Sequence, residues 1–265
     1  MPAAAVAHVN LRNGWLDLAW PKEHGSWSLA LEPLALGLVA APSAGGAWLS
    51  LAVIGAFFAR RPLRLAWVET APERRTAARV VFGLLAGLSL FAFAAAVLTG
   101  GLACLGWLLP SAVGGGVFIF HDVRGTGRTA WAEIAGAAAF ACVPAALGIL
   151  AGRSAAEAAA LALLGCGRSL PAVLTVRAVL RGAKSGVRSA GPAVTAAVLA
   201  VLVAGLLAGC GIISSFPVAA LALLAIRTTG LLVWPSPILR ARTLGMIEAG
   251  LGLAFALTVG FALRR

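Results

Sequence analysis

The stretch AARVVFGLLAGLSLFAFAAAVL, residues 77–98, decides the fold class of this chain. A helix of about 20 apolar residues spans a bilayer, so this stretch predicts a transmembrane helix. Arg74, Arg75 and Arg79 stand at its start, and an uncharged Thr-Gly-Gly turn follows it. Since loops rich in Lys and Arg stay in the cytoplasm, the helix is expected to begin on the cytoplasmic side.

The same alternation of basic clusters and apolar stretches runs through the whole chain. Further clusters hold Arg60, Arg61 and Arg64; Arg124 and Arg128; Arg168, Arg177, Arg181, Lys184 and Arg188; and Arg227, Arg240 and Arg242. Hydrophobic residues make up 61% of the chain and charged residues 11%, a balance that excludes a soluble domain. The net charge of +12 does not indicate nucleic acid binding, because the charges lie between hydrophobic spans. We expect an all-α polytopic membrane protein.

Nine apolar spans are predicted, with a cytoplasmic tail over residues 1–20 and the transmembrane domain over residues 21–265. The spans are 25–41, 46–60, 77–98, 101–120, 129–151, 155–176, 190–209, 212–233 and 243–262. With the N-terminus in the cytoplasm, 18 of the 21 Lys and Arg fall on the cytoplasmic side, and the C-terminus lies outside. The start of the chain does not have the pattern of a cleaved signal peptide.

Small residues give two further expectations. Two GLLAG segments, at 83–87 and 205–209, have the GxxxG spacing that permits close helix contact, and they hint at an internal repeat. The four cysteines lie inside apolar runs without CxxC spacing, so they are interpreted as packing residues.

Polar groups at the start of the first span form one candidate site. Lys22 and His24 precede the predicted helix, where N-terminal amides attract anions. Glu32 lies about two turns deeper, and a carboxylate inside a membrane is costly without a partner or a function. Glu32 either takes part in chemistry or pairs with an arginine that holds helices together.

Arginines at the inner ends of the second and sixth spans form another candidate site. They are Arg60, Arg61 and Arg64, and Arg168, Arg177 and Arg181. Because guanidinium groups match phosphate oxygens bidentately, two such clusters facing each other would hold a diphosphate. The alternative is that they set topology and contact lipid headgroups.

Other polar residues extend the list. Asp122 follows His121 at the end of the fourth span, and Arg227 and Glu248 lie at membrane depth, where opposite charges are expected to pair. The chain has no P-loop, GxSxG, HExxH or dinucleotide fingerprint, and we expect neither a metal nor a cofactor.

The segment Pro21-Lys22-Glu23-His24-Gly25-Ser26-Trp27 resembles the opening motif of the YwiC-like family of bacterial membrane proteins. Two later segments, 168–178 and 245–248, also resemble that family. The layout is similar to that of the UbiA superfamily of intramembrane prenyltransferases, which implies a nine-helix bundle around a cavity open to the cytoplasm and to lipid. It also implies location in a bacterial inner membrane.

One departure from the UbiA pattern bears on chemistry. UbiA-type enzymes hold magnesium on aspartate-rich motifs after their second and sixth helices, whereas this chain has arginines at both places and no paired aspartates. Magnesium prefers hard oxygen ligands, so that metal site is not expected here. Arginines would have to supply the positive charge that binds a diphosphate.

Three functional hypotheses remain open. In the first, the protein is a metal-independent transferase acting on an isoprenoid diphosphate or another anionic lipid. Its catalytic residues would be Glu32, His24 and Asp122, and its substrate-binding residues Lys22, Arg60, Arg61, Arg64, Arg168, Arg177, Arg181, Arg227 and Glu248. In the second, it is a carrier or transporter of an anionic lipid or small anion. In the third, it is a membrane assembly factor. Membrane lipids are the expected partners in all three.

Overall fold

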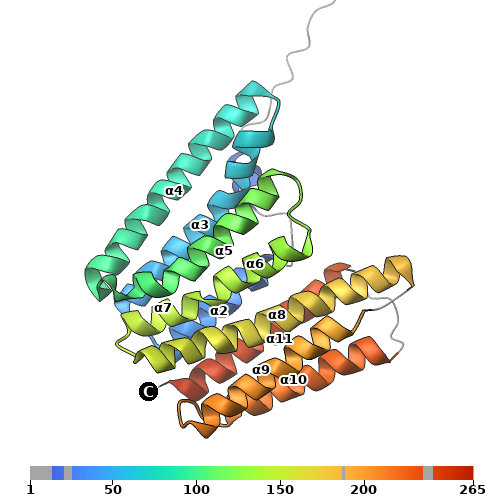
Figure 1. Cartoon of the computed structure of the whole chain (residues 1–265). Helices are drawn as coiled ribbons and strands as arrows, with labels where there is room; N and C mark the ends of the chain where they lie inside the picture. Colours follow the sequence, from blue (N-terminus) through green and yellow to red (C-terminus); the bar gives the residue numbers. More distant parts are fainter. Residues whose placement is uncertain (1–13, 21–25, 187–188, 235–240, 265) are drawn as a thin grey trace, which may run out of the picture.

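The computed structural model describes residues 14–20, 26–186, 189–234 and 241–264, and these residues fold into helices (Figure 1). The elements are α1 (Gly14–Ala19), α2 (Ser26–Ala40), α3 (Ala44–Val68), α4 (Pro72–Gly100), the short 3-10 helix η1 (Leu102–Cys104), α5 (Leu105–Val123), α6 (Ala130–Ala141), α7 (Val143–Leu150), α8 (Ala155–Ser185), α9 (Gly191–Gly209), α10 (Phe216–Val233) and α11 (Ala241–Leu263).

Each of the nine predicted spans is helical, which confirms the all-α polytopic fold. Within the described residues, seven helical segments are long and apolar enough to cross a membrane: α4, η1 with α5, α6 with α7, α8, α9, α10 and α11. The other two are α2, which has 15 residues, and α3, whose second half carries three arginines. Large apolar side chains such as Leu84, Leu98 and Leu109 are exposed on the surface, as expected of residues that face lipid.

The helices pack mostly against their neighbours in the chain, and the bundle closes where the first long helix meets the last. The pairs α3–α4, α5–α6, α8–α9 and α9–α10 lie side by side, and α2 packs along α11. α2 also contacts α6, α7 and α8, so it lies inside the bundle. This position places its polar residues in the interior.

Three helices continue past the apolar stretches that predicted them. α3 runs on to Val68, α4 starts at Pro72 and α8 extends to Ser185. Arginine favours helix about as well as leucine, so these segments remain helical until a stop signal occurs. Gly186, in the left-handed conformation with φ 74°, ends α8. The clusters around Arg60 and Arg177 therefore lie on helices rather than in loops, and helical register decides where each side chain points.

The predicted span 129–151 consists of two helices. α6 ends at Ala141, and α7 begins at Val143 with Pro144 in its first turn. Proline has no N–H to donate to the carbonyl four residues earlier, which explains the interruption.

The GLLAG segments do not make the predicted close helix contacts. An added Cβ at Gly83, Gly87, Gly205 or Gly209 would meet nothing within 4 Å. Close approach occurs instead at other glycines, among them Gly37, where a Cβ would overlap Leu147, and Gly165, where it would lie 2.9 Å from the Ala141 carbonyl oxygen. The GxxxG interpretation is wrong for packing within this chain.

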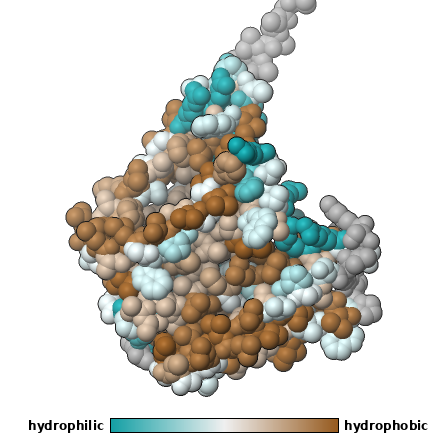
Figure 2. All heavy atoms as spheres, viewed as in Figure 1, coloured by the Kyte–Doolittle hydropathy of each residue, from teal (hydrophilic) through white to brown (hydrophobic). Residues whose placement is uncertain are grey.

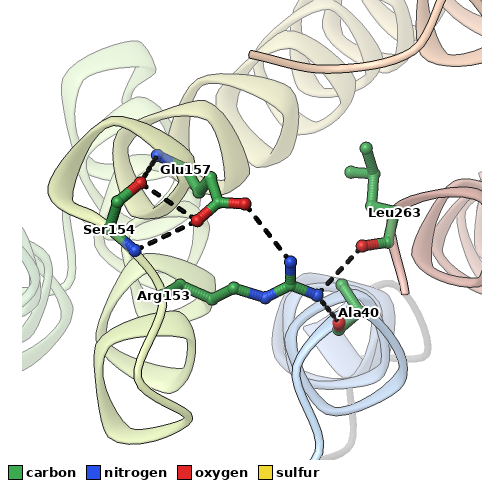
Figure 3. A network of polar contacts seen from close by, with 5 residues as sticks. All are labelled: Ala40, Arg153, Ser154, Glu157 and Leu263. Atoms are coloured by element: carbon green, nitrogen blue, oxygen red, sulfur yellow. Dashed lines mark hydrogen bonds and ion pairs between the residues drawn. The ribbon is translucent and has the colours of Figure 1, made fainter. Parts of the chain in front are cut away.

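The two ends of the bundle differ in polarity. The connections α3–α4, α5–α6 and α8–α9 lie at one end, called the basic end below, where hydrophilic residues gather (Figures 1 and 2). At the opposite end, Arg153 joins three helices (Figure 3). Its guanidinium donates to the carbonyl oxygens of Ala40 at 2.8 Å and Leu263 at 3.0 Å, and to Glu157 at 3.3 Å. A cation near these carbonyls satisfies the ends of α2 and α11.

Candidate functional site

A cavity of about 660 Å³ lies within the basic half of the bundle, between α2, α3, α5, α6, α8 and α11. Its walls combine charged side chains with apolar ones, among them Phe57, Phe118 and Phe140. The charged groups form two sets. The mouth consists of Arg60, Arg64, Asp122, Arg128, Glu133 and Arg177. The deep cluster consists of Glu32, Arg168 and Glu248, which line the cavity, and of Arg227, which lines a smaller neighbouring pocket.

At the mouth, α3 presents two arginines to one carboxylate of α5. Arg60 and Arg64 are four residues apart, so they share a helix face. Asp122 lies 3.9 Å from Arg60 Nε and 3.5 Å from an Arg64 terminal nitrogen. Arg60 also lies over the ring of Phe118, 5.0 Å from its centroid. Both distances to Asp122 are longer than those of usual charge-assisted hydrogen bonds. An anionic ligand can therefore replace Asp122 as the partner of these guanidinium groups.

The opposite side of the mouth belongs to α8 and the start of α6. Arg177 makes an ion pair with Glu133 and donates to the carbonyl oxygen of Arg128 at 3.1 Å. The Arg128 side chain is exposed and lines the cavity. Arginines from α3 and α8 thus line the same cavity.

The deep cluster joins four helices. Arg168 of α8 lies 3.6 Å from Glu32 of α2 and 3.3 Å from Glu248 of α11, and it donates to the Glu248 carbonyl oxygen at 2.7 Å. Arg227 of α10 forms an ion pair with the other oxygen of Glu248. The Arg168, Glu32 and Glu248 side chains are 5%, 10% and 7% exposed. Pairing at this depth offsets part of the cost of removing these charges from water.

The two sets differ in net charge. Four arginines and two carboxylates give the mouth a formal charge of +2, whereas two arginines and two carboxylates make the deep cluster neutral. The excess positive charge of the cavity therefore lies entirely at its mouth.

Several predicted site residues do not line the cavity. Arg61 points away from it and pairs with Asp17 at 3.6 Å, and its guanidinium donates to the Trp20 carbonyl oxygen. Arg181, one turn beyond Arg177, is exposed and is not part of the cavity wall. Of the six arginines predicted to bind a diphosphate, four line the cavity. Lys22 and His24 lie outside the described residues.

Some features of the site were not predicted. His121 points to Thr126, with its Nδ1 2.9 Å from the hydroxyl oxygen, while the neighbouring Asp122 faces the cavity. Gly252 of α11 packs so closely on α2 that an added Cβ would overlap the Glu32 carboxylate. Consecutive helical residues point about 100° apart, which separates His121 from Asp122.

Among the described residues, no group of three or more His, Cys, Asp or Glu is placed to hold a metal ion. The four cysteines are free thiols. Among the described residues that line the cavity, the positively charged side chains are arginines.

Comparison with known families bears on the part of the chain that holds the mouth residues other than Arg177. Residues 20–147 match the YwiC-like protein family. The resemblance is thereby confirmed over nearly half of the chain. The YwiC-like segment contains Glu32, Arg60, Arg64, Asp122 and Glu133, whereas the later segments that resemble the family fall outside it. Neither a curated protein nor a solved structure matches the chain.

Proposed function

We propose that this protein binds the headgroup of an anionic, phosphorylated lipid at the mouth of its cavity. The observation that carries the proposal is the net charge of +2 at the mouth, set beside apolar walls that include three phenylalanines. A phosphate monoester or diphosphate brings two or more negative charges, and guanidinium groups bind its oxygens bidentately. An isoprenoid diphosphate, with its hydrocarbon chain against the phenylalanines, is one such ligand.

The orientation in this proposal places the basic end in the cytoplasm of a bacterial cell, with the protein in the inner membrane and the C-terminus outside. The support is the gathering of Lys and Arg clusters at the connections of one end, together with the positive-inside rule. The cavity would then receive lipid headgroups from the cytoplasmic leaflet, whose surface is anionic.

The proposal includes a metal-independent transferase of UbiA-like type, with Glu32 or Asp122 as the group that takes up a proton or stabilises a cation. Both carboxylates line the cavity, and Asp122 is the one nearer the bound head. A carrier of the same lipid would use the same mouth without product formation. Substituting Glu32 or Asp122 separates the two, because a transferase would keep lipid binding and lose turnover.

The test of binding is native mass spectrometry of the full chain with added geranylgeranyl diphosphate, with and without EDTA. We expect binding that survives EDTA and weakens about tenfold to a hundredfold in Arg64→Ala or Arg177→Ala, since a hydrogen bond to a charged group contributes about 1.5–3 kcal/mol. Arg61→Ala and Arg181→Ala are matched controls on the same two helices. Equal loss in controls and mouth variants would overturn the proposal.

A further inference from the structure

One donor of the deep cluster has no hydrogen-bond acceptor. Within the described residues, Arg168 Nε is buried and unpartnered, although its terminal nitrogen donates to Glu248. The Glu32 Oε2 atom is 3.6 Å from Arg168 Nε, beyond normal hydrogen-bond distance. A buried polar group without a partner is costly, and such groups in native proteins call for an explanation.

Arg168 and Glu32 both line the cavity, so the gap between them lies at the cavity wall. An oxygen placed to one side of the line that joins these two atoms, which are 3.6 Å apart, can lie about 2.9 Å from both. That oxygen would accept from Arg168 Nε and donate to the Glu32 carboxylate. The carboxylate accepts and cannot donate, whereas the guanidinium donates and cannot accept.

A hydroxyl is the simplest ligand group that does both. An ether or ketone oxygen can accept from Arg168, but it has no proton for Glu32. An ammonium can donate to Glu32, but it would place a third positive charge beside Arg168 and Arg227. Because the deep cluster is already neutral, an uncharged group fits it better than an ion. We propose that the deep end of the cavity is a subsite for the hydroxyl group of a lipid alcohol, held between Arg168 Nε and Glu32.

The subsite is separate from the mouth. Arg168 and Arg177 are nine residues apart on α8, or about 14 Å at 1.5 Å per residue. Leu29 and Val173 line the cavity and offer apolar contacts for the chain of the alcohol. The inference rests on the proposed function in that both ligands share one cavity, but different residues bind each of them.

Gly252 leaves the space that the Glu32 carboxylate, the proposed hydrogen-bond acceptor, occupies. A Cβ at this residue would occupy the space of the Glu32 carboxylate, so Gly252→Ala must shift either that carboxylate or α2 relative to α11, and both change the gap between Glu32 and Arg168. Gly250, on the same helix, is exposed, and an added Cβ there would meet nothing within 4 Å. The two glycines provide a matched pair of variants that differ by position and not by chemistry.

The test compares tetradecan-1-ol with its methyl ether, 1-methoxytetradecane, as ligands of the full chain. The micelles are of an amine oxide, since maltoside detergents bring hydroxyl groups of their own. Affinity is measured from the concentration dependence of the unfolding midpoint, followed by tryptophan fluorescence. We expect the alcohol to bind about tenfold or more tightly than the ether, because the ether cannot donate to the carboxylate.

The variants decide the location. Glu32→Leu, which has no hydrogen-bond acceptor, and Gly252→Ala should each abolish most of the preference for the alcohol, and Gly250→Ala should keep it. Equal affinity for alcohol and ether in the wild type would overturn the inference. A preference for the alcohol that survives Glu32→Leu would also overturn it, and this variant decides the question if Gly252→Ala does not fold. Arg64→Ala should keep the preference for the alcohol over the ether. If the protein prefers the alcohol but binds no phosphorylated lipid, the proposed function is overturned and the hydroxyl subsite is not.

Discussion

Replacing Gly252 with alanine should destabilise the protein, whereas the same change at Gly250 should not. In a helix, alanine is favoured over glycine by about 1 kcal/mol. At Gly250 the new methyl group meets open space, so we expect this gain, or no change, in the free energy of unfolding. At Gly252 the methyl group overlaps the Glu32 carboxylate, and either that carboxylate or the α2–α11 contact must give way.

The magnitude follows from the two ways of relieving the overlap. Inserting a methyl group into a packed interior costs about 1–3 kcal/mol. Removing one partner of a buried ion pair costs about 3–5 kcal/mol, and Glu32 is 3.6 Å from Arg168. With about 3 kcal/mol as the common value and the helical gain of about 1 kcal/mol subtracted, Gly252→Ala should lose about 2 kcal/mol. It should lie about 3 kcal/mol below Gly250→Ala.

The assay is unfolding in mixed micelles with increasing mole fraction of dodecyl sulfate, followed by tryptophan fluorescence. Both variants are single added methyl groups on one helix, so detergent effects on α11 should cancel between them. If Gly252→Ala is as stable as Gly250→Ala, then Glu32 does not lie against Gly252, and the geometry assigned to the deep cluster is wrong.

Three other outcomes test other parts of the structure. Arg153→Met should destabilise the fold by about 2–4 kcal/mol in the same assay, because two carbonyl oxygens at helix ends lose a charged donor; unchanged stability would contradict the network of Figure 3. Arg168→Met should cost more than about 3 kcal/mol, since it leaves two buried carboxylates with less positive charge nearby, and normal stability would show that the deep cluster is hydrated. In intact cells, a membrane-impermeant maleimide should label exposed Cys210, at the end opposite the basic end, and spare buried Cys104; labelling of Cys210 only after lysis would reverse the proposed orientation.

The sequence predicted the fold because the length and hydrophobicity of each segment, which are local properties, determine whether it forms a membrane helix. A run of about 20 apolar residues is helical in a membrane whatever it packs against, since its backbone groups have no other partners. The nine stretches therefore appear as helices where they were expected. Helix contacts are not local, and the same reasoning failed for the GLLAG segments. Gly83 and Gly205 face open space, while Gly252, in no such motif, makes the close contact.

The site was predicted in part, for a similar reason. A charge inside a membrane needs a partner, so pairing of Glu32 and of Glu248 with arginines could be foreseen from burial alone. The choice among arginines depends on helical register beyond the apolar stretches. Arg64 follows Arg60 by one turn and shares its face, whereas Arg61 is turned away by about 100°. The predicted spans ended at residues 60 and 176, so they did not define the helical register of the arginines beyond those points.

The net charge of +12 overstates how basic the interior of this protein is. Arg74 and Arg79 are exposed on the α4 helix, where they need no ligand to explain them, since orientation in the membrane is reason enough. Inside the cavity, carboxylates accompany the arginines, and at the deep cluster they cancel them. An anion is therefore attracted to the mouth but gains nothing further from moving deeper. In the proposed function, the charged headgroup therefore binds near the basic end, and the deep cluster presents a neutral, hydrogen-bonding surface to the part of the ligand that reaches the membrane interior.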